Sequence, residues 1–166
     1  MAEHRTALCP LRPDHSASLL AEVFSHGDPD PSGFVFPGGR PATRDQVDAL
    51  VRDLLAGADE GAIRPFVFVD SEGQIVGQGT ITAGEPGEAA EVSLLIAPGH
   101  RQRGHAERGL LLLADEAFAG GAGTVEAVVH VANGPVLTIL PRVGFTQVSP
   151  ANPVTETEIW AKASPL

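Results

Sequence analysis

Apolar residues recur along the chain with two periods, one typical of strands and one typical of amphipathic helices. Residues 5–12 have strand character, and Pro10 favours the edge of a sheet because proline donates no ladder hydrogen bond. Leucine, valine and phenylalanine then recur at helical spacing over 15–25, with Asp14 placed to cap this helix. The chain is therefore expected to begin with an edge strand followed by an amphipathic helix.

A second amphipathic helix is predicted after a loop at 26–42 that is rich in glycine and proline. Thr43 is a good N-cap for it, apolar residues keep the helical spacing as far as Leu55, and Gly57 is expected to end it. Three strands follow in succession, at 64–69, 74–82 and 89–96. They predict an antiparallel meander.

The last part of the chain alternates helix and strand. An apolar helix is expected over 104–118, a strand over 124–131 and a short helix from Pro135 to about Leu140. Two final strands are expected at 144–148 and 155–160. We predict one α+β domain over the whole chain. Its central sheet is mixed, mostly antiparallel and six- to seven-stranded, it is flanked by about four helices, and helix 104–118 crosses between a parallel pair of strands.

Charge and composition then narrow the possible partners. The 21 acidic side chains outnumber the 11 basic ones and give a net charge of -10, which repels a phosphate backbone and makes nucleic acid an unexpected partner. The acidity favours solubility and, weakly, cationic substrates such as amines. The single Cys9 makes no internal disulfide, and no stretch approaches the roughly 18 apolar residues of a membrane span. We expect a cytoplasmic protein with no membrane partner, either a monomer or a homodimer.

The segment that follows the strand 89–96 carries the candidate chemistry. A Pro98-Gly99 turn leads into a loop with Arg101 and Arg103, and a helix begins near Gly104. Free backbone N–H groups and the positive end of a helix dipole then converge on one point. The pattern indicates an anion cradle in which Gly104 and Ala106 leave the backbone open to a diphosphate.

These residues resemble a known family. Arg101-x-x-Gly104-x-Ala106 is similar to the pyrophosphate loop of the GNAT acetyltransferases, R/Q-x-x-G-x-G/A, and it follows the strand and proline usual there. Asn133, with Gly144-Phe145 eleven and twelve residues later, resembles the second signature of that family. The two segments lie in the family's order, so a GNAT-like fold is expected.

The first half of the chain extends the resemblance to the RimJ/RimL type of acetyltransferase. Leu11-Arg12-Pro13 before the first helix and Asp70-x-x-Gly73-x-x-Val76-Gly77 across a hairpin are similar to that type. The implied reaction moves an acetyl group from acetyl-CoA, a co-substrate, to an amine of a small molecule or a protein N-terminus. No metal is expected, because His105-x-Glu107 matches half of a zinc-deaminase motif but the paired cysteines are missing.

The resemblance also implies a coenzyme site. The pantetheine arm would lie between the strands 91–96 and 124–131, pairing with main chain as an added strand does. Asn133 would contact the arm, although a helix N-cap beside Pro135 is an equally good interpretation. The implied coenzyme-binding residues are Leu94, Leu95, Ile96, Arg101, Gln102, Arg103, Gly104, His105, Ala106 and Asn133.

Two residues are candidates for the general base that deprotonates the amine. Glu91 opens the strand beside the thioester and resembles the family's glutamate, with an ordinary exposed carboxylate as the alternative. His130 is the second, since strand alternation places it on one face with Glu126 and Val128, although a strand histidine is often structural.

The general acid is the main departure from the family. Many relatives carry a tyrosine where this chain has Leu140, and the sequence contains no tyrosine. A thiol has a pKa of about 8.5, so a thiolate is a tolerable leaving group. The absence of the tyrosine is therefore expected to slow the reaction without abolishing it. A non-catalytic module that binds or senses acyl-CoA is the alternative function.

The acceptor is expected to bind beside the loop 26–42. Phe34 and Phe36 are candidates for apolar walls, and Arg40 or Arg44 for partners of an acceptor carboxylate.

Overall fold

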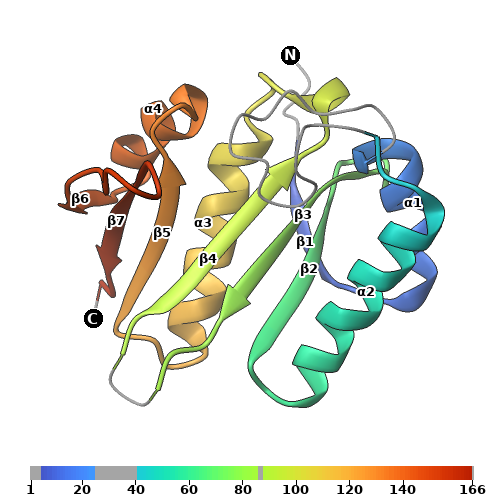
Figure 1. Ribbon diagram of the computed structural model, residues 1–166, viewed down its shortest axis with the longest axis horizontal. Coiled ribbons are helices and arrows are strands. Elements are labelled where there is room, and N and C mark those ends of the chain that lie inside the picture. Colours follow the sequence, from blue (N-terminus) through green and yellow to red (C-terminus); the bar gives the residue numbers. More distant parts are fainter. Residues whose placement is uncertain (1–4, 25–40, 86–87, 166) are drawn as a thin grey trace.

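The computed structural model describes residues 5–24, 41–85 and 88–165. Over these ranges the chain forms a seven-stranded sheet in the order β1-β2-β3-β4-β5-β7-β6 (Figure 1). Its strands are β1 Ala7–Pro10, β2 Ile63–Val69, β3 Ile75–Thr82, β4 Ala90–Ile96, β5 Thr124–His130, β6 Thr146–Ser149 and β7 Thr157–Ala163. Neighbouring strands are antiparallel except β4 and β5, so the predicted meander, the edge position of β1 and the parallel pair are confirmed.

Helices cover both faces of this sheet. The first helical segment comprises a 3₁₀ turn at Pro13–His15, α1 Ser16–Leu19 and a π-helical turn at Leu20–Phe24. The others are α2 Arg44–Asp59, a 3₁₀ turn at Pro98–His100, α3 His105–Ala119 and α4 Gly134–Arg142. In Figure 1, α1 and α2 lie in front of the sheet and α3 lies behind it. The face of the sheet that points away from the viewer in Figure 1 is therefore the one that α3 covers.

Two local predictions for the helices are wrong. Asp14 does not cap the first helix, because it lies inside the 3₁₀ turn and its carboxylate accepts a hydrogen bond from the Arg12 side chain at 3.0 Å. Gly57 does not end α2, which continues to Asp59 and stops before Gly61, where φ is 77°. A glycine inside a helix is tolerated when something packs closely on it, and a Cβ at Gly57 would lie 3.2 Å from Ile63.

The buried residues form one cluster on each face of the sheet. Phe68, fully buried, is central to the cluster under α3, while Leu19 and Val47 belong to the cluster under α1 and α2. Gly79 of β3 and Gly109 of α3 leave room for the Phe68 ring, because a Cβ would lie 2.8 Å from the ring at Gly79 and 3.1 Å at Gly109. The glycines thereby let α3 pack closely against the sheet.

The parallel pair β4 and β5 is joined only near its start. The register pairs Ala90 with Val125 and Glu91 with Glu126, and no further pair is formed between these two strands. Beyond it the two strands diverge toward their C-terminal ends (Figure 1). This divergence opens the sheet beside the N-terminus of α3.

Candidate active site

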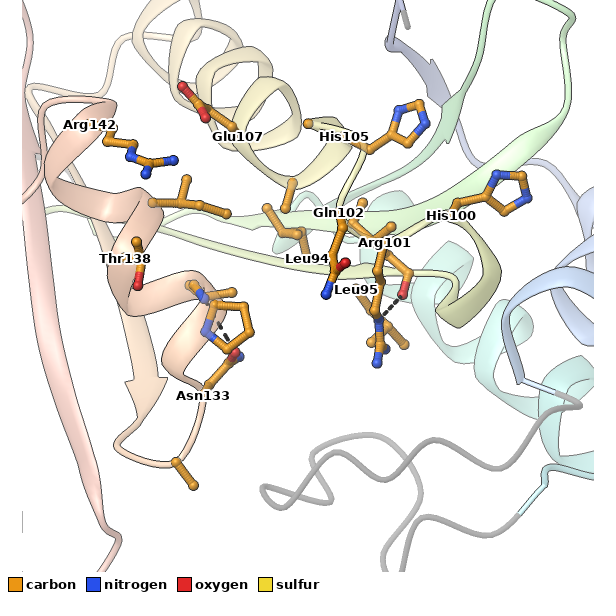
Figure 2. A pocket seen from close by; sticks show the side chains of 17 residues that line it. Leu94, Leu95, His100, Arg101, Gln102, His105, Glu107, Asn133, Thr138 and Arg142 are labelled. Carbon is orange, nitrogen blue, oxygen red and sulfur yellow. Dashed lines mark hydrogen bonds between the residues drawn. The ribbon is translucent and has the colours of Figure 1, made fainter.

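A cavity of about 610 Å³ lies at the open end of the diverging strands. Its walls come from the end of β4, the loop that follows, the first turn of α3, and the turn and helix after β5. Figure 2 shows Asn133, Thr138 and Arg142 on the α4 side, facing Leu94, Leu95 and Gln102 across the space. The volume is within the usual range for a small-molecule site.

The predicted coenzyme-binding residues gather around this cavity, with one exception. Arg103 is exposed and does not line it. Those that do are Leu94, Leu95, Ile96, Arg101, Gln102, Gly104, His105, Ala106 and Asn133. Segments 25 or more positions apart in the sequence are thus brought to one space.

The loop before α3 has the backbone of an anion-binding turn. Gln102 and Gly104 both adopt left-handed conformations, with φ of 61° and 83°. Gly104 is the N-cap of α3 and provides no side-chain cap, so the helix dipole and the first N–H groups are presented at the cavity. Arg101 donates from Nε to the carbonyl of Ile96 at 3.0 Å, which ties the loop back to β4 (Figure 2).

Two histidines, one within this loop and one at its end, anchor it to the protein. His105, the first residue of α3, is 2% exposed, and its Nδ1 lies 2.8 Å from the hydroxyl of Thr6. The ring of His100 meets it edge to face, with centroids 6.3 Å apart. His100 Nδ1 is buried and has no hydrogen-bond partner in the part of the chain that is described. The loop is therefore fixed to the protein body by ring packing as well as by side-chain hydrogen bonds.

Asn133 is a helix N-cap, and it also lies in the cavity wall. It is the N-cap of α4, its side-chain oxygen accepting the N–H of Val136 at 3.4 Å. It also lines the cavity, so its amide group is placed at the wall where the pantetheine arm was expected.

Sequence reasoning missed the contribution of α4 beyond Asn133. Pro135, Thr138, Ile139 and Arg142 line the cavity from this helix. Their spacing of three, four and seven is the signature of one helix face, so the pattern was visible in the sequence. Arg142 adds a cation to the α4 wall.

Glu91 lies at the point where β4 and β5 separate. It is exposed and is not among the residues that line the cavity, whose nearest β4 residue is Leu94. Ala90 and Val92 are buried in the cluster under α3, so strand alternation directs Glu91 to the opposite face. Glu126 occupies the paired position on β5, which sets two carboxylates side by side.

His130, at the end of β5, does not line the cavity either. Its Nδ1 accepts the N–H of Ala132 at 3.0 Å, and its Nε2 lies 3.4 Å from Oε2 of Glu156. Both ring nitrogens are thus engaged by the protein.

The other residues singled out in the sequence, at the position of the general acid and of the acceptor, lie outside the cavity or outside the described residues. Leu140 is fully buried in the cluster under α3 and does not line the cavity. Arg44 pairs with Asp48 one helical turn away at 3.1 Å, which commits its guanidinium to α2. The suggested acceptor residues Phe34, Phe36 and Arg40 lie outside the described residues.

The described ranges contain neither a membrane-spanning helix nor a metal-binding cluster. None of the helices there is both long and apolar enough to cross a bilayer. In the same ranges, no three or more His, Cys, Asp or Glu side chains gather as metal ligands.

Comparison with known proteins gives the family. The model of the acetyltransferase (GNAT) domain matches residues 5–146. No curated protein sequence matches the chain. A Bordetella pertussis protein assigned to the GNAT-family acetyltransferases has a similar structure, with a TM-score of 0.73 and 20% identity over 98% of each chain.

Two further solved structures share the fold. RimJ from Mycobacterium smegmatis, in complex with CoA-disulfide, has a TM-score of 0.78 at 22% identity, covering 96% of this chain and 82% of that one. A chimera of the Vibrio cholerae spermidine N-acetyltransferase SpeG has a TM-score of 0.72 at 15% identity over 95% of each chain. The predicted GNAT-like α+β fold is confirmed. With the family model spanning most of its length, the chain belongs to the GNAT acetyltransferases.

Proposed function

We propose that the protein transfers an acetyl group from acetyl-CoA, bound in the cavity beside α3, to a cationic amine that approaches the opposite face of the sheet. The observation that carries this proposal is the left-handed turn at Gln102 and Gly104, which opens the uncapped N-terminus of α3 onto the cavity between the diverging strands. Family membership supports the reaction class.

The residues present fit the coenzyme. A diphosphate is an anion, and the start of α3 provides main-chain donors and a favourable dipole for it. Leu94 and Ile96 contribute apolar surface along one wall, and the unpaired edge of β4 beyond Glu91 is available to amide groups. Bound acetyl-CoA would supply an acyl group activated as a thioester.

The pantetheine arm has room to reach the point where the strands part. From Ile96 back to Glu91 the strand rises about 17 Å at 3.3 Å per residue. An extended pantetheine chain is comparable to roughly four to five residues of extended peptide. A diphosphate at the start of α3 therefore puts the reacting end of the molecule close to Glu91.

Glu91 is our proposed general base. It is exposed on the face opposite α3, at the last pair of the parallel register. Glu126 beside it adds a second negative charge, which favours an acceptor that arrives as an ammonium ion. The chemical class of the acceptor is then a primary amine with net positive charge, on a small molecule or at a protein N-terminus.

The chain contains no tyrosine to protonate the departing thiolate, and the corresponding Leu140 is buried. Solvent can protonate the thiolate, because a thiolate is already a moderate leaving group near neutral pH.

We also place the protein in the cytoplasm, because no stretch of the sequence approaches the length of a membrane span.

The test is acetyl transfer measured as free thiol released from acetyl-CoA in the presence of an amine panel. The panel contains cationic diamines, peptides with a free N-terminus and a neutral arylamine, and Glu91→Gln serves as the matched variant. We expect release to accelerate with cationic amines and to fall about 10²-fold in Glu91→Gln. Tight coenzyme binding with no accelerated release would instead support a non-catalytic acyl-CoA-binding module.

A further inference from the structure

His130 was a candidate base, yet its imidazole has no nitrogen available for a substrate proton. Nδ1 accepts the main-chain N–H of Ala132 at 3.0 Å, so in this arrangement the ring hydrogen is on Nε2. Nε2 in turn faces Oε2 of Glu156 at 3.4 Å. The side chain of His130 is 17% exposed, against 66% for Glu156, so the ring is the more enclosed partner.

The segment that His130 holds is part of the cavity wall. Ala132 and Asn133 both line the cavity, and they lie in the turn between β5 and α4. The carbonyl of His130 also accepts the N–H of Asn133 at 2.9 Å. The residue thus fixes two successive N–H groups of the turn, one through its ring and one through its main chain.

Glu156 supports the same turn from the segment before β7. Its carbonyl accepts the N–H of Val131 at 2.8 Å, and its own N–H donates to the carbonyl of Asn152 at 2.7 Å. Glu156 adopts φ of 55°, a conformation that non-glycine residues rarely take. The surrounding contacts must therefore hold Glu156 in this conformation, and residues held in this way are often found at functional sites.

We propose that His130 is a positioning residue for the coenzyme site and not the general base. Its imidazole caps the turn 131–133 and, with Glu156, fixes the wall that presents Asn133 to the pantetheine arm. The geometry is that of an Asx turn, in which the side chain of one residue accepts the N–H two positions on. This inference rests on the proposed coenzyme site.

The Asx-like geometry supplies a sharp experiment. In His130→Asn, the side-chain oxygen is the same number of bonds from Cα as Nδ1 and can accept the same N–H, but the variant has no titratable ring. His130→Val keeps a strand-forming side chain and removes the acceptor. The two variants therefore distinguish capping of the turn by His130 from a role of His130 as general base.

We would measure the Kd for coenzyme A by calorimetry, and kcat and KM for acetyl-CoA, with melting temperatures as the folding control. His130→Val should weaken coenzyme binding about threefold to tenfold, the equivalent of one hydrogen bond, with kcat within about twofold of wild type. His130→Asn should restore both the Kd and KM to within about twofold.

Three outcomes would overturn the proposal. A loss of kcat of about 10²-fold in His130→Asn, with coenzyme binding intact, would make His130 the base. An unchanged Kd in a folded His130→Val protein would mean that the turn is not held by the ring. Failure of the wild-type protein to bind coenzyme A would remove the proposed function together with this inference. The asparagine variant decides between cap and base even if the valine variant does not fold.

Discussion

Thr6 and His105 are joined by a buried hydrogen bond although 99 positions separate them in the sequence. The hydroxyl oxygen and Nδ1 lie 2.8 Å apart. Thr6 directly precedes the edge strand β1, while His105 is the first residue of α3 and lines the cavity. The contact therefore ties the start of the described chain to the helix terminus at which we propose that the coenzyme binds.

Replacing Thr6 with valine tests this contact at nearly constant volume. The buried Nδ1 of His105 would lose its hydroxyl partner, and we expect the free energy of unfolding to fall by about 1–3 kcal/mol. Thermal or urea denaturation measures it. The control is Thr82→Val, at an exposed position of β3. Equal stability of the two variants would show that the bond contributes nothing.

The close approach of Gly79 to Phe68 yields a second prediction. A methyl group at Gly79 would lie 2.8 Å from the ring and 3.1 Å from Leu113, inside the packed core. Gly79→Ala should destabilise the protein by about 1–3 kcal/mol through overpacking. Gly123→Ala is the matched control, because a Cβ there meets nothing within 4 Å. A Gly79→Ala variant as stable as the control would contradict the packing described for α3.

The paired carboxylates Glu91 and Glu126 predict opposite effects on stability and on function. Like charges on neighbouring strands repel, so Glu126→Gln should leave the protein as stable or stabilise it by about 0.2–1 kcal/mol. The same change should raise KM for cationic acceptors about tenfold and leave KM for a neutral arylamine within about twofold, since only the ammonium ion is attracted by the charge. Steady-state kinetics with both acceptor types measures this.

The control for that experiment is Glu60→Gln, an exposed carboxylate at the end of α2. A KM increase of the same size for charged and neutral acceptors would argue against an electrostatic role for Glu126.

Much of the fold was accessible from the sequence because local signals agreed with the tertiary structure. The meander, the crossover helix and the edge strand each have a periodicity or a proline that agrees with the observed arrangement. Helix ends were less accessible. Gly57 is a residue type that often ends helices, but α2 continues through it and Ile63 packs close to it, a contact that no local pattern reveals.

The candidate site was predictable from the sequence only where its residues are close together in the chain. The loop around Gly104 was predicted because its chemistry is local, the left-handed glycine and the helix start lying within a few residues. The proposed role of His130 was not predictable, because it depends on Glu156, which the pairing of β5 with β7 brings close although α4 and β6 lie between them in the sequence. The α4 residues Thr138 and Arg142 were missed for lack of a reason to place that helix beside α3.

The most direct test of the central claim is a calorimetric titration of coenzyme A into the wild-type protein, Gly104→Asn and Gly104→Glu. Asparagine tolerates the left-handed conformation at φ 83° better than other side chains, whereas glutamate adds strain and a negative charge at the proposed diphosphate site. We predict one site per chain, a modest loss for Gly104→Asn and a loss of about 100-fold or more for Gly104→Glu. Equal affinity of the glutamate variant and the wild-type protein would contradict diphosphate binding at the start of α3.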